Sequence, residues 1–417
     1  MVTDLKGKHL LGISGLGRIG KLTLWYHLQL RHFDGFVINV GRGVGRSLAD
    51  IIHAIETDST YGLLGRFLHG HPAASCEIDI IDETAGIFEI DGLLVKILRK
   101  ARNPKDIDWA NEGIRLVVDS TGRFLDPTIP PGHAQGSIRG HLESGAETVI
   151  VSAPLKIKDS SLKLPSDSKV FVYGINHISY DPAKHRIISA ASCTTTGLAH
   201  MIKPLIETKE TSKILTASMS TVHAVTNTQS ILDSIPANDA TDLRKNRSVL
   251  NNIILTSTGA ADTLEQVMPE IKRVGFMADS VRVPINTSSL ISLNVTFHAP
   301  MPDKGSPVIN RAFINDIYKQ AAEGPQKGLL TYSDKQNVSS DFIGFESAIV
   351  IEGHETHVRT AFMSFPAEVF GKYDIHGVPD IKIPVTHAKI FGWYDNEFGS
   401  YVTCLGKLTV YTDQIIH

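Results

Sequence analysis

The sequence of 417 residues predicts an α/β fold in which a mostly parallel N-terminal sheet is followed by an α+β half with a mostly antiparallel sheet. In the first half, short runs of Val, Ile and Leu alternate with polar or helical stretches, as is typical of buried parallel strands. In the second half, LISLNVTFHA alternates strictly between apolar and polar residues, as a half-buried strand does. At about 150 residues per domain, the length fits two or three domains.

The composition is that of an ordinary globular protein, with 42% hydrophobic and 20% charged residues. Lys and Arg (41) nearly balance Asp and Glu (44), for a formal charge of −3, so nothing indicates nucleic acid or an anionic membrane as a partner. The sequence shows no uncharged apolar run of about 18 residues and no secretory leader pattern. Its three cysteines lie far apart, so we expect a cytoplasmic protein without disulfides.

The expected strands of the first half lie at 9–13, 36–40, 114–120, 148–154, 169–176 and 186–192. A helix is expected over KLTLWYHLQL, because Leu22, Trp25 and Leu28 recur in it at helical spacing. CTTTGLAHMIKPLIE also has its apolar residues on one helical face, so a second helix is predicted to begin at Cys193. The change of pattern at this point places a domain boundary near residue 191.

A glycine-rich turn follows the first expected strand. GLGRIG places Gly15, Gly17 and Gly20, with Arg18 and Ile19 between them, in the G-x-G-x-x-G pattern. In a dinucleotide-binding turn the first glycine permits the tight turn, the second lets backbone approach a pyrophosphate, and the third allows close helix–sheet packing. An ordinary strand–helix turn is the alternative, and the position between a strand and a helix favours a Rossmann-type dinucleotide site.

The residue that would select the cofactor is unusual. The second strand ends in INVGRGVGR, so Val40 and Gly41 occupy the position where an acidic residue usually binds the adenosine ribose, and Arg42 follows. A missing carboxylate beside an arginine is the arrangement that admits a 2′-phosphate. We therefore expect NAD or NADP as the cofactor, with Arg42 in its site. The alternative is that Arg42 and Arg46 lie in a solvated basic loop.

Cys193 lies among hydroxyl side chains at the predicted start of a helix, and a helix N-terminus favours the thiolate form. His223, in MSTVHAVTNTQ, follows another strand-like run. A histidine close to a cysteine can take its proton and later move a proton on a reacting oxygen. The alternative for an arbitrary pair is a buried small residue and a core histidine, and the sequence alone does not show that the two side chains touch.

The polar residues around this pair favour the catalytic interpretation. Neutral donors and one fixed positive charge bind phosphate without removing a proton from any group. The candidates are Ser192, Thr194, Thr226, Thr228, Thr258, Gly259 and Arg282.

No metal site is predicted. HGH at 69–71 and HETH at 354–357 are expected to be surface or loop histidines, because they lack the H-E-x-x-H arrangement and a third ligand. Cys76 and Cys404 lack the hydroxyl setting and are expected to be packing residues.

Several short blocks occur in the order found in one enzyme family: ISGLGRIGKL, VVDSTGRF, VIVSAP, SAASCTTTGLA, STVHAVTNTQSILD, NNIILTSTGAA, VRVP, SSDF and GWYDNEFGS. They cover almost the whole chain, and SCTT, TVHA and WYDNEFG together are highly specific. On these blocks the sequence resembles the glyceraldehyde-3-phosphate dehydrogenase family. The resemblance implies a Rossmann-type NAD(P)-binding domain over 1–191, a catalytic domain over 192–396, and a C-terminal helix over 397–417 that packs on the first domain.

The resemblance also implies a reaction, the phosphorylating oxidation of glyceraldehyde 3-phosphate to 1,3-bisphosphoglycerate with NAD(P), in glycolysis or gluconeogenesis. Cys193 would attack the aldehyde, and inorganic phosphate would cleave the resulting thioester. His223 would activate the cysteine and serve as acid and base. Thr226 and Arg282 would bind the C3 phosphate of the substrate, with Thr228 near them.

The remaining site residues follow from the same resemblance. The binding site for inorganic phosphate would contain Ser192, Thr194, Thr258 and Gly259. The cofactor contacts would include Asn39, Ser120, Thr121, Gly122 and, at the nicotinamide carboxamide, Asn396. The loop at 233–252 would reach the cofactor of a neighbouring subunit in a homotetramer.

The sequence departs from the family pattern in five places, of which the missing acidic residue at Val40 and Gly41 is described above. Thr196 stands where relatives carry Asn, and Ser400 precedes Tyr401 where relatives have Tyr directly. Extra residues occur around 126–140 and 341–390. These departures leave two alternatives open: a dehydrogenase of another phosphorylated aldehyde, such as erythrose 4-phosphate, and a family member that works chiefly by binding a partner.

Overall fold

The computed structural model of the chain describes residues 5, 7–71, 75–99, 101–236, 238, 240–298 and 307–416. The chain divides into two compact units, of which the first comprises Met1–Thr196 with Glu397–His417 and the second comprises Gly197–Asn396. The division falls inside helix α5 (Cys193–Glu207), a few residues beyond the boundary that the sequence indicates near 191.

Within the described residues, the first unit contains a sheet of nine strands in the order β10-β11-β9-β8-β1-β2-β7-β6-β5. Its strands are Leu10–Ser14 (β1), Gly35–Asn39 (β2), Ile78–Asp82 (β5), Ile87–Ile90 (β6), Leu93–Leu98 (β7), Leu116–Asp119 (β8), Thr148–Val151 (β9), Ser168–Val170 (β10) and Ile187–Ser189 (β11). All pairs from β10 to β7 are parallel, and only β7–β6 and β6–β5 are antiparallel. The predicted mostly parallel sheet is therefore confirmed.

The helices of the first unit are α1 (Arg18–Leu30), α2 (Leu48–Glu56), α3 (Leu64–His69), α4 (Arg139–Glu143) and α9 (Thr403–Ile416), and a short β3–β4 pair (Thr57–Asp58, Gly62–Leu63) lies beside them. The helical spacing of Leu22, Trp25 and Leu28 corresponds to the buried side of α1. Trp25 also donates from Nε1 to Ile55 O at 2.8 Å, which ties α1 to the end of α2.

Three parts of this sheet differ from the expected strands, one of them β7 (Leu93–Leu98), for which no strand was expected. The strand expected over 169–176 ends at Val170, because Asn176 folds back, accepting from Val172 N–H at 2.8 Å and donating to Val170 O at 2.9 Å. The β5–β6 hairpin has no counterpart among the expected strands. Its outer strand, IDIID, is a charged edge strand without a strong apolar run, as edge strands commonly are.

The second unit contains, within its described residues, an eight-stranded sheet in the order β13-β14-β12-β15-β19-β17-β16, with β18 also paired to β19. Its strands are Ile214–His223 (β12), Ile254–Thr256 (β13), Gly275–Arg282 (β14), Ser289–His298 (β15), Leu330–Ser333 (β16), Ile349–Glu352 (β17), His357–Phe365 (β18) and Ile381–Tyr394 (β19). Only β12–β14 and β16–β17 pair in parallel. The predicted mostly antiparallel sheet is confirmed.

The side chains of β15 alternate between buried and half-buried, as its sequence predicts, and β15 pairs antiparallel with both β12 and β19. The further helices of this unit are α6 (Ala260–Val267), α7 (Arg311–Glu323) and α8 (Ala367–Gly371). Tyr318 of α7 is fully buried and donates from its hydroxyl to Met201 O of α5 at 2.8 Å. Among the described residues, none of the helices is both long enough and apolar enough to cross a membrane.

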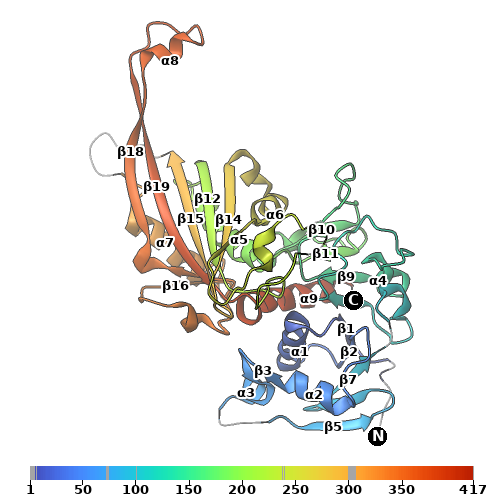
Figure 1. The fold of residues 1–417 in the computed structure, drawn as a ribbon. Coiled ribbons are helices and arrows are strands. Elements are labelled where there is room, and N and C mark those ends of the chain that lie inside the picture. The colour runs from blue at the N-terminus through green and yellow to red at the C-terminus, as the bar shows by residue number, and fades with distance from the viewer. Residues whose placement is uncertain are drawn as a thin grey trace. The chain divides into compact units, whose positions relative to one another are not determined.

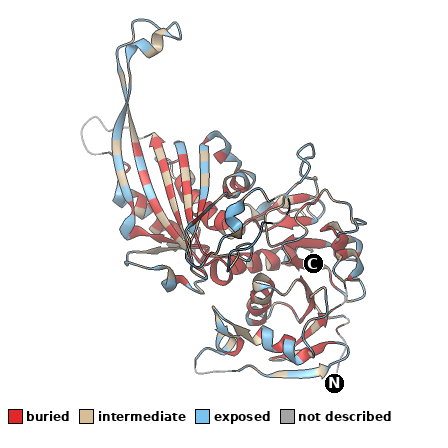
Figure 2. Cartoon of the chain, in the orientation of Figure 1, coloured by how far each residue is buried: buried red, intermediate tan, exposed pale blue. Residues whose placement is uncertain are grey.

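The later part of the stretch 341–390, from His357 onward, forms a β-ribbon. Strands β18 and β19 pair over nine positions, and α8 lies at the tip of the ribbon, beyond the ends of the other strands (Figure 1). Much of the ribbon is exposed, whereas the neighbouring strands carry buried side chains (Figure 2). Phe362, Met363 and Tyr373 are among its exposed large side chains.

Candidate active site

The glycine-rich turn connects β1 to α1 in the first unit. Gly15 has a φ of 96°, which favours glycine, and its N–H donates to Asn39 O at 2.8 Å. A Cβ at Gly20 would lie 2.0 Å from Gly15 O, so only glycine lets α1 approach the turn this closely. A Cβ at Gly17 would meet no atom within 4 Å, so the space above this backbone is open. These three properties fit a dinucleotide whose pyrophosphate lies at the N-terminus of α1.

The carboxyl ends of three parallel strands meet beside this turn. Ser14 pairs with Asn39 of β2 on one side and with Asp119 of β8 on the other. Dinucleotides bind at such strand ends, where the strand order changes direction. A cavity of about 280 Å³ lies at this edge, and its lining includes Gly15, Asn39, Gly41, Arg42 and Thr121.

Three arginines line the same cavity. They are Arg42, which the sequence predicts, and Arg102 and Arg123, which it does not. All three are exposed, and none of them forms an ion pair within the part of the chain that the structure describes. Their guanidinium groups give this edge a positive charge that suits an anionic cofactor.

The hydroxyls of Ser120 and Thr121 hold the turn in place. Ser120 Oγ lies 2.9 Å from Gly15 O and 3.1 Å from Ser14 O, to which it donates. Thr121 donates to Asp119 Oδ1 from its hydroxyl at 2.7 Å and from its N–H at 2.9 Å. Gly122, the next residue, has a φ of 64°. Two of the predicted cofactor residues therefore shape the backbone of the cleft.

A series of buried hydrogen bonds from Trp109 through His141 fixes Asp119, the residue that accepts from Thr121. Trp109 Nε1 donates to His141 Nδ1 at 2.9 Å, and His141 Nε2 lies 2.9 Å from Asp119 Oδ2. Because an indole N–H only donates, His141 Nδ1 is the acceptor and its Nε2–H donates to Asp119. All three side chains are buried. Sequence reasoning missed this series of hydrogen bonds, since no motif links residues so far apart.

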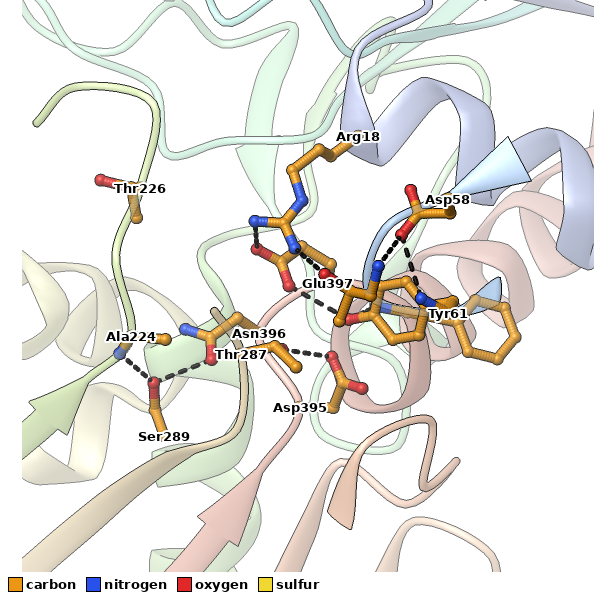
Figure 3. Close-up of polar contacts among 12 residues, drawn as sticks. Arg18, Asp58, Tyr61, Ala224, Thr226, Thr287, Ser289, Asp395, Asn396 and Glu397 are labelled. Atoms are coloured by element: carbon orange, nitrogen blue, oxygen red, sulfur yellow. Dashed lines mark hydrogen bonds and ion pairs between the residues drawn. The ribbon is translucent and has the colours of Figure 1, made fainter. Parts of the chain in front are cut away.

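Arg18 makes a salt bridge with Glu397, with Nη1 and Oε1 2.9 Å apart, and its Nη2 donates to Thr60 Oγ1 at 3.2 Å. Tyr61 donates from its hydroxyl to Glu397 Oε2 at 3.1 Å, as Figure 3 shows. Within the first unit the Arg18 side chain thus fixes the start of the C-terminal segment. Ile19 packs against the core beside it.

Cys193 is the first residue of α5. Ser192 caps this helix, because its Oγ accepts from Thr195 N–H at 3.1 Å. Ala191, just before the cap, has a φ of 59°, which is rare for a residue with a Cβ, and its carbonyl accepts from Tyr401 OH at 3.1 Å. Backbone conformations of this kind cluster at functional sites. The Ser192 cap and the Tyr401 hydrogen bond therefore fix the turn that places Cys193 at the N-terminus of α5.

The two single-residue departures, Thr196 and Ser400, are both buried. Ser400 lies in a π-helical turn, Phe398–Val402, in which Val402 N–H donates to Glu397 O at 2.8 Å. Within this turn the hydroxyl of Tyr401 donates to the carbonyl of Ala191. Thr194 is also buried.

A cluster of polar side chains lies at the strand ends of the second unit. His223 and Arg282 are opposite each other in the parallel pair β12–β14, and Arg282 Nη1 contacts His223 Nδ1. Asn396 Nδ2 lies 3.1 Å from each ring nitrogen of His223. Asn396 Oδ1 accepts from Ser289 Oγ at 2.8 Å, and Ser289 Oγ accepts from Ala224 N–H at 2.9 Å (Figure 3).

His223 is held as a neutral imidazole. Burial, followed by the nearby Arg282 guanidinium, lowers the pKa of His223 to about 3. Ala224 O, which only accepts, lies 2.7 Å from His223 Nδ1, whereas Arg282 Nη1, which only donates, contacts the same nitrogen, so these contacts do not assign a single tautomer. In the tautomer that donates to Ala224 O, the proton is on Nδ1. The lone pair is then on Nε2, which can accept a proton.

The predicted phosphate-binding threonines of the second unit lie near helix and strand ends. Thr226 Oγ1 and Thr228 Oγ1 are 3.0 Å apart. Thr258 Oγ1 accepts from Ala260 N–H at 3.2 Å, at the start of α6. A Cβ at Gly259 would meet no atom within 4 Å, so the N-terminus of α6 is open there.

The structure thus brings His223, Arg282 and Asn396 together within the second unit. Cys193, Ser192 and Thr194 belong to the first unit, and the pairing of Cys193 with His223 stays a prediction.

The other cysteines and histidine motifs agree with the packing and surface interpretations. Burial raises the pKa of the Cys76 thiol to about 11 and that of the buried Cys404 thiol to about 12, so both are protonated at neutral pH. His69 pairs with Asp91 at 2.8 Å, and its side chain is 44% exposed. The side chains of His354 and His357 are also largely exposed, on either side of Glu355.

A parallel sheet with this glycine-rich turn defines a Rossmann-type dinucleotide-binding domain. The family model of the glyceraldehyde 3-phosphate dehydrogenase NAD binding domain matches residues 9–127, and that of the C-terminal domain matches residues 192–367. The chain is 33% identical to glyceraldehyde-3-phosphate dehydrogenase 2 of Streptomyces avermitilis over 96% of this chain and 97% of the relative. It is 30% identical to glyceraldehyde-3-phosphate dehydrogenase 1 of Bacillus subtilis, over 93% and 94%. The chain belongs to the glyceraldehyde-3-phosphate dehydrogenase family.

Proposed function

We propose that the protein catalyses the phosphorylating oxidation of glyceraldehyde 3-phosphate to 1,3-bisphosphoglycerate with NAD(P), through a thioester at Cys193. The observation that carries this proposal is the cluster of His223, Arg282 and Asn396, which combines a proton acceptor, a fixed positive charge and an amide. The relatives named above, both glyceraldehyde-3-phosphate dehydrogenases, support the same reaction class.

In the proposed mechanism, the Cys193 thiolate adds to the aldehyde carbon, and the carbonyl oxygen gains a proton to give a thiohemiacetal. NAD(P), when bound, supplies the acceptor for the hydride that leaves this carbon. His223 takes the hydroxyl proton as the thiohemiacetal becomes a thioester. A phosphate oxygen then attacks the thioester carbon, the C–S bond breaks, and Cys193 leaves as thiolate.

Arg282 links substrate binding to the acid–base role of His223. We propose that the C3 phosphate of the substrate binds Arg282, with Thr226 and Thr228 as neutral donors. Arg282 is one of the two causes that lower the pKa of His223. A bound phosphate dianion would offset this charge and so raise the pKa of His223 towards the working pH.

The attacking phosphate is assigned to Ser192, Thr194, Thr258 and Gly259. The open backbone at Gly259, at the N-terminus of α6, supports this assignment. Ser192 already accepts a backbone hydrogen bond as the cap of α5. Its Oγ also lies 2.8 Å from Thr195 Oγ1, and because phosphate oxygens accept, we expect the Ser192 hydroxyl to turn its hydrogen towards a bound phosphate.

The dependence of the rate on phosphate tests this reaction. We expect cofactor reduction with glyceraldehyde 3-phosphate to need inorganic phosphate and to slow at least about tenfold with erythrose 4-phosphate, since that chain is one carbon longer between its aldehyde and its phosphate. The measurement is the steady-state rate for both aldehydes, with and without phosphate. A faster rate with erythrose 4-phosphate that does not depend on phosphate would identify a water-cleaving dehydrogenase instead.

The cofactor cleft supports the use of NADP as well as NAD. We expect Arg42→Ala to raise the KM for NADP about three- to tenfold, with a smaller effect on NAD, because only NADP has a 2′-phosphate for the guanidinium to bind. Arg46→Ala is the matched control, since Arg46 lies in the same loop but does not line the cleft. Equal effects of Arg42→Ala on both cofactors would show that Arg42 does not bind the 2′-phosphate.

We further propose that the protein is a cytoplasmic homotetramer. The loop at 233–252 and its surroundings expose large apolar side chains: Ile231, Leu232, Ile235 and Leu243. Exposed apolar groups that gather in this way mark surfaces that another chain covers.

A further inference from the structure

A set of metal-ligating side chains lies in the first unit, away from the cleft. His9 Nε2 lies 3.0 Å from Asp413 Oδ1 and 2.9 Å from Oδ2, and His32 Nε2 lies 2.8 Å from the same Oδ2. The three ligand atoms lie within 4.8 Å of one another. In the part of the chain that the structure describes, no other group of three or more His, Cys, Asp or Glu side chains brings its ligand atoms this close together.

The two imidazoles are held in place by the surrounding chain. His9, just before β1, donates from its N–H to Asp34 Oδ2 at 3.0 Å, and its carbonyl accepts from Asp34 N–H at 2.8 Å. The buried Phe33 ring lies 4.8 Å, between ring centroids, from both the His9 and the His32 ring. Ligands fixed in this way lose little freedom when a cation binds, which favours binding.

The chemistry of the three groups suits a first-row divalent cation. Two imidazole nitrogens and one carboxylate are common ligands of Zn²⁺, with a water in the fourth tetrahedral position. Metal–ligand distances of about 2.1 Å place ligand atoms about 3.4 Å apart, so on binding Zn²⁺ the two His–Asp distances of 2.8 to 3.0 Å would lengthen by about half an ångström, and the two imidazole nitrogens, which lie within 4.8 Å of each other, would settle at about 3.4 Å. The side chains of His9 and His32 are 30% and 22% exposed, which gives a cation access from solvent.

The charge of the site also permits a cation. Arg115 interacts electrostatically with Asp413, but Arg115 is itself paired with Glu147 at 2.7 Å. Without a metal, both Nε2–H groups donate to the Asp413 carboxylate. When a metal ion binds, the ring proton of each of the two histidines moves to Nδ1, and both Nε2 lone pairs face the cation.

We propose that His9, His32 and Asp413 form a binding site for Zn²⁺ or a similar divalent cation. The site joins three segments of the chain: the residue before β1, the chain after α1, and the C-terminal helix α9. Because the unfolded chain does not hold these groups together, a bound cation stabilises the folded first unit.

The test uses the full-length chain with Cys193→Ser, because a reactive thiolate also binds Zn²⁺. The protein is freed of metal with a chelator, dialysed, and titrated with ZnCl₂ by calorimetry and by thermal unfolding. We expect one equivalent to bind and the midpoint of unfolding to rise by about 5 °C or more at a hundredfold excess over the Kd. Asp413→Asn and His32→Gln should each weaken binding at least about tenfold.

Two controls separate this site from general histidine binding. Asp91→Asn removes the His69–Asp91 pair, which has the same 2.8 Å spacing as His32–Asp413 but no second histidine, and should leave Zn²⁺ binding unchanged. His354→Gln should also leave it unchanged. If Asp413→Asn does not fold, His32→Gln, which changes a partly exposed side chain, decides the test. Absence of binding, or binding that His32→Gln does not weaken, would show that the three residues form only a hydrogen-bond network.

Discussion

Replacement of Cys193 by serine is expected to lower kcat with glyceraldehyde 3-phosphate by at least about 10³-fold and to leave the Kd for NAD(P) unchanged. A serine hydroxyl at the start of α5 is almost wholly protonated at neutral pH, whereas a thiol at a helix N-terminus is partly ionised and a far stronger nucleophile. The cofactor residues at the glycine-rich turn are untouched by this change. Steady-state kinetics and a cofactor titration by fluorescence measure the two quantities.

Cys76→Ser is the matched control, because Cys76 is a thiol of the same unit with a pKa raised to about 11. It should keep wild-type kcat, and iodoacetamide should modify Cys193 before Cys76 or Cys404. A Cys193→Ser protein that reduced cofactor at the wild-type rate would exclude the covalent mechanism.

Replacement of His223 by glutamine is expected to lower kcat by about 10²- to 10⁴-fold, the usual contribution of a general acid–base catalyst. The amide cannot accept a proton from the thiohemiacetal hydroxyl. The pH profile of kcat, which reports the enzyme–substrate complex, should lose the limb that titrates with His223. His298→Gln is the control, since His298 ends the neighbouring strand β15 at the opposite end of the sheet, and it should keep wild-type kcat.

The same variant changes the pH dependence of stability. His223 has a pKa of about 3 in the folded protein and about 6.5 when unfolded, so between these values the unfolded state binds more protons. The free energy of unfolding of the wild type should therefore fall, relative to His223→Gln, as the pH decreases from 6.5 towards 3, by at most about 1.4 kcal/mol per pH unit. Denaturant unfolding of both proteins at several pH values measures this difference. A constant difference would mean that His223 is not a buried neutral imidazole.

The local features of the site could be predicted because single short segments encode them. GLGRIG defines its turn through three glycines, and Gly20 is required because any Cβ there would meet Gly15 O. The start of α5 at Cys193 likewise follows from the apolar spacing after it and from Ser192, a good helix cap.

The supporting interactions could not be predicted, because they join distant segments through side chains with no spacing rule. Trp109, His141 and Asp119 form one buried chain, although each comes from a different part of the sequence. The Arg18–Glu397 salt bridge spans almost the whole chain. The glycine motif led us to expect Arg18 at the cofactor. A backbone motif does not determine which residue a long side chain such as Arg18 contacts.

The β18–β19 ribbon shows a second limit of sequence patterns. Its stretch of sequence is rich in Gly and Pro and has only short strand-like runs, and its exposed strands alternate weakly, so two long strands are not evident from the pattern. The pairing of nine positions is visible only when the partner strand is known.

Formation of NAD(P)H in a single rapid mixing experiment tests the central claim most directly. The enzyme is mixed with NAD⁺ and glyceraldehyde 3-phosphate in buffer free of phosphate. If phosphate cleaves a thioester at Cys193, NADH should form rapidly up to at most one equivalent per chain and then stop, and added phosphate should restart it. Continuous NADH formation without phosphate, or no rapid phase in the wild type, would contradict phosphorylating covalent catalysis by Cys193.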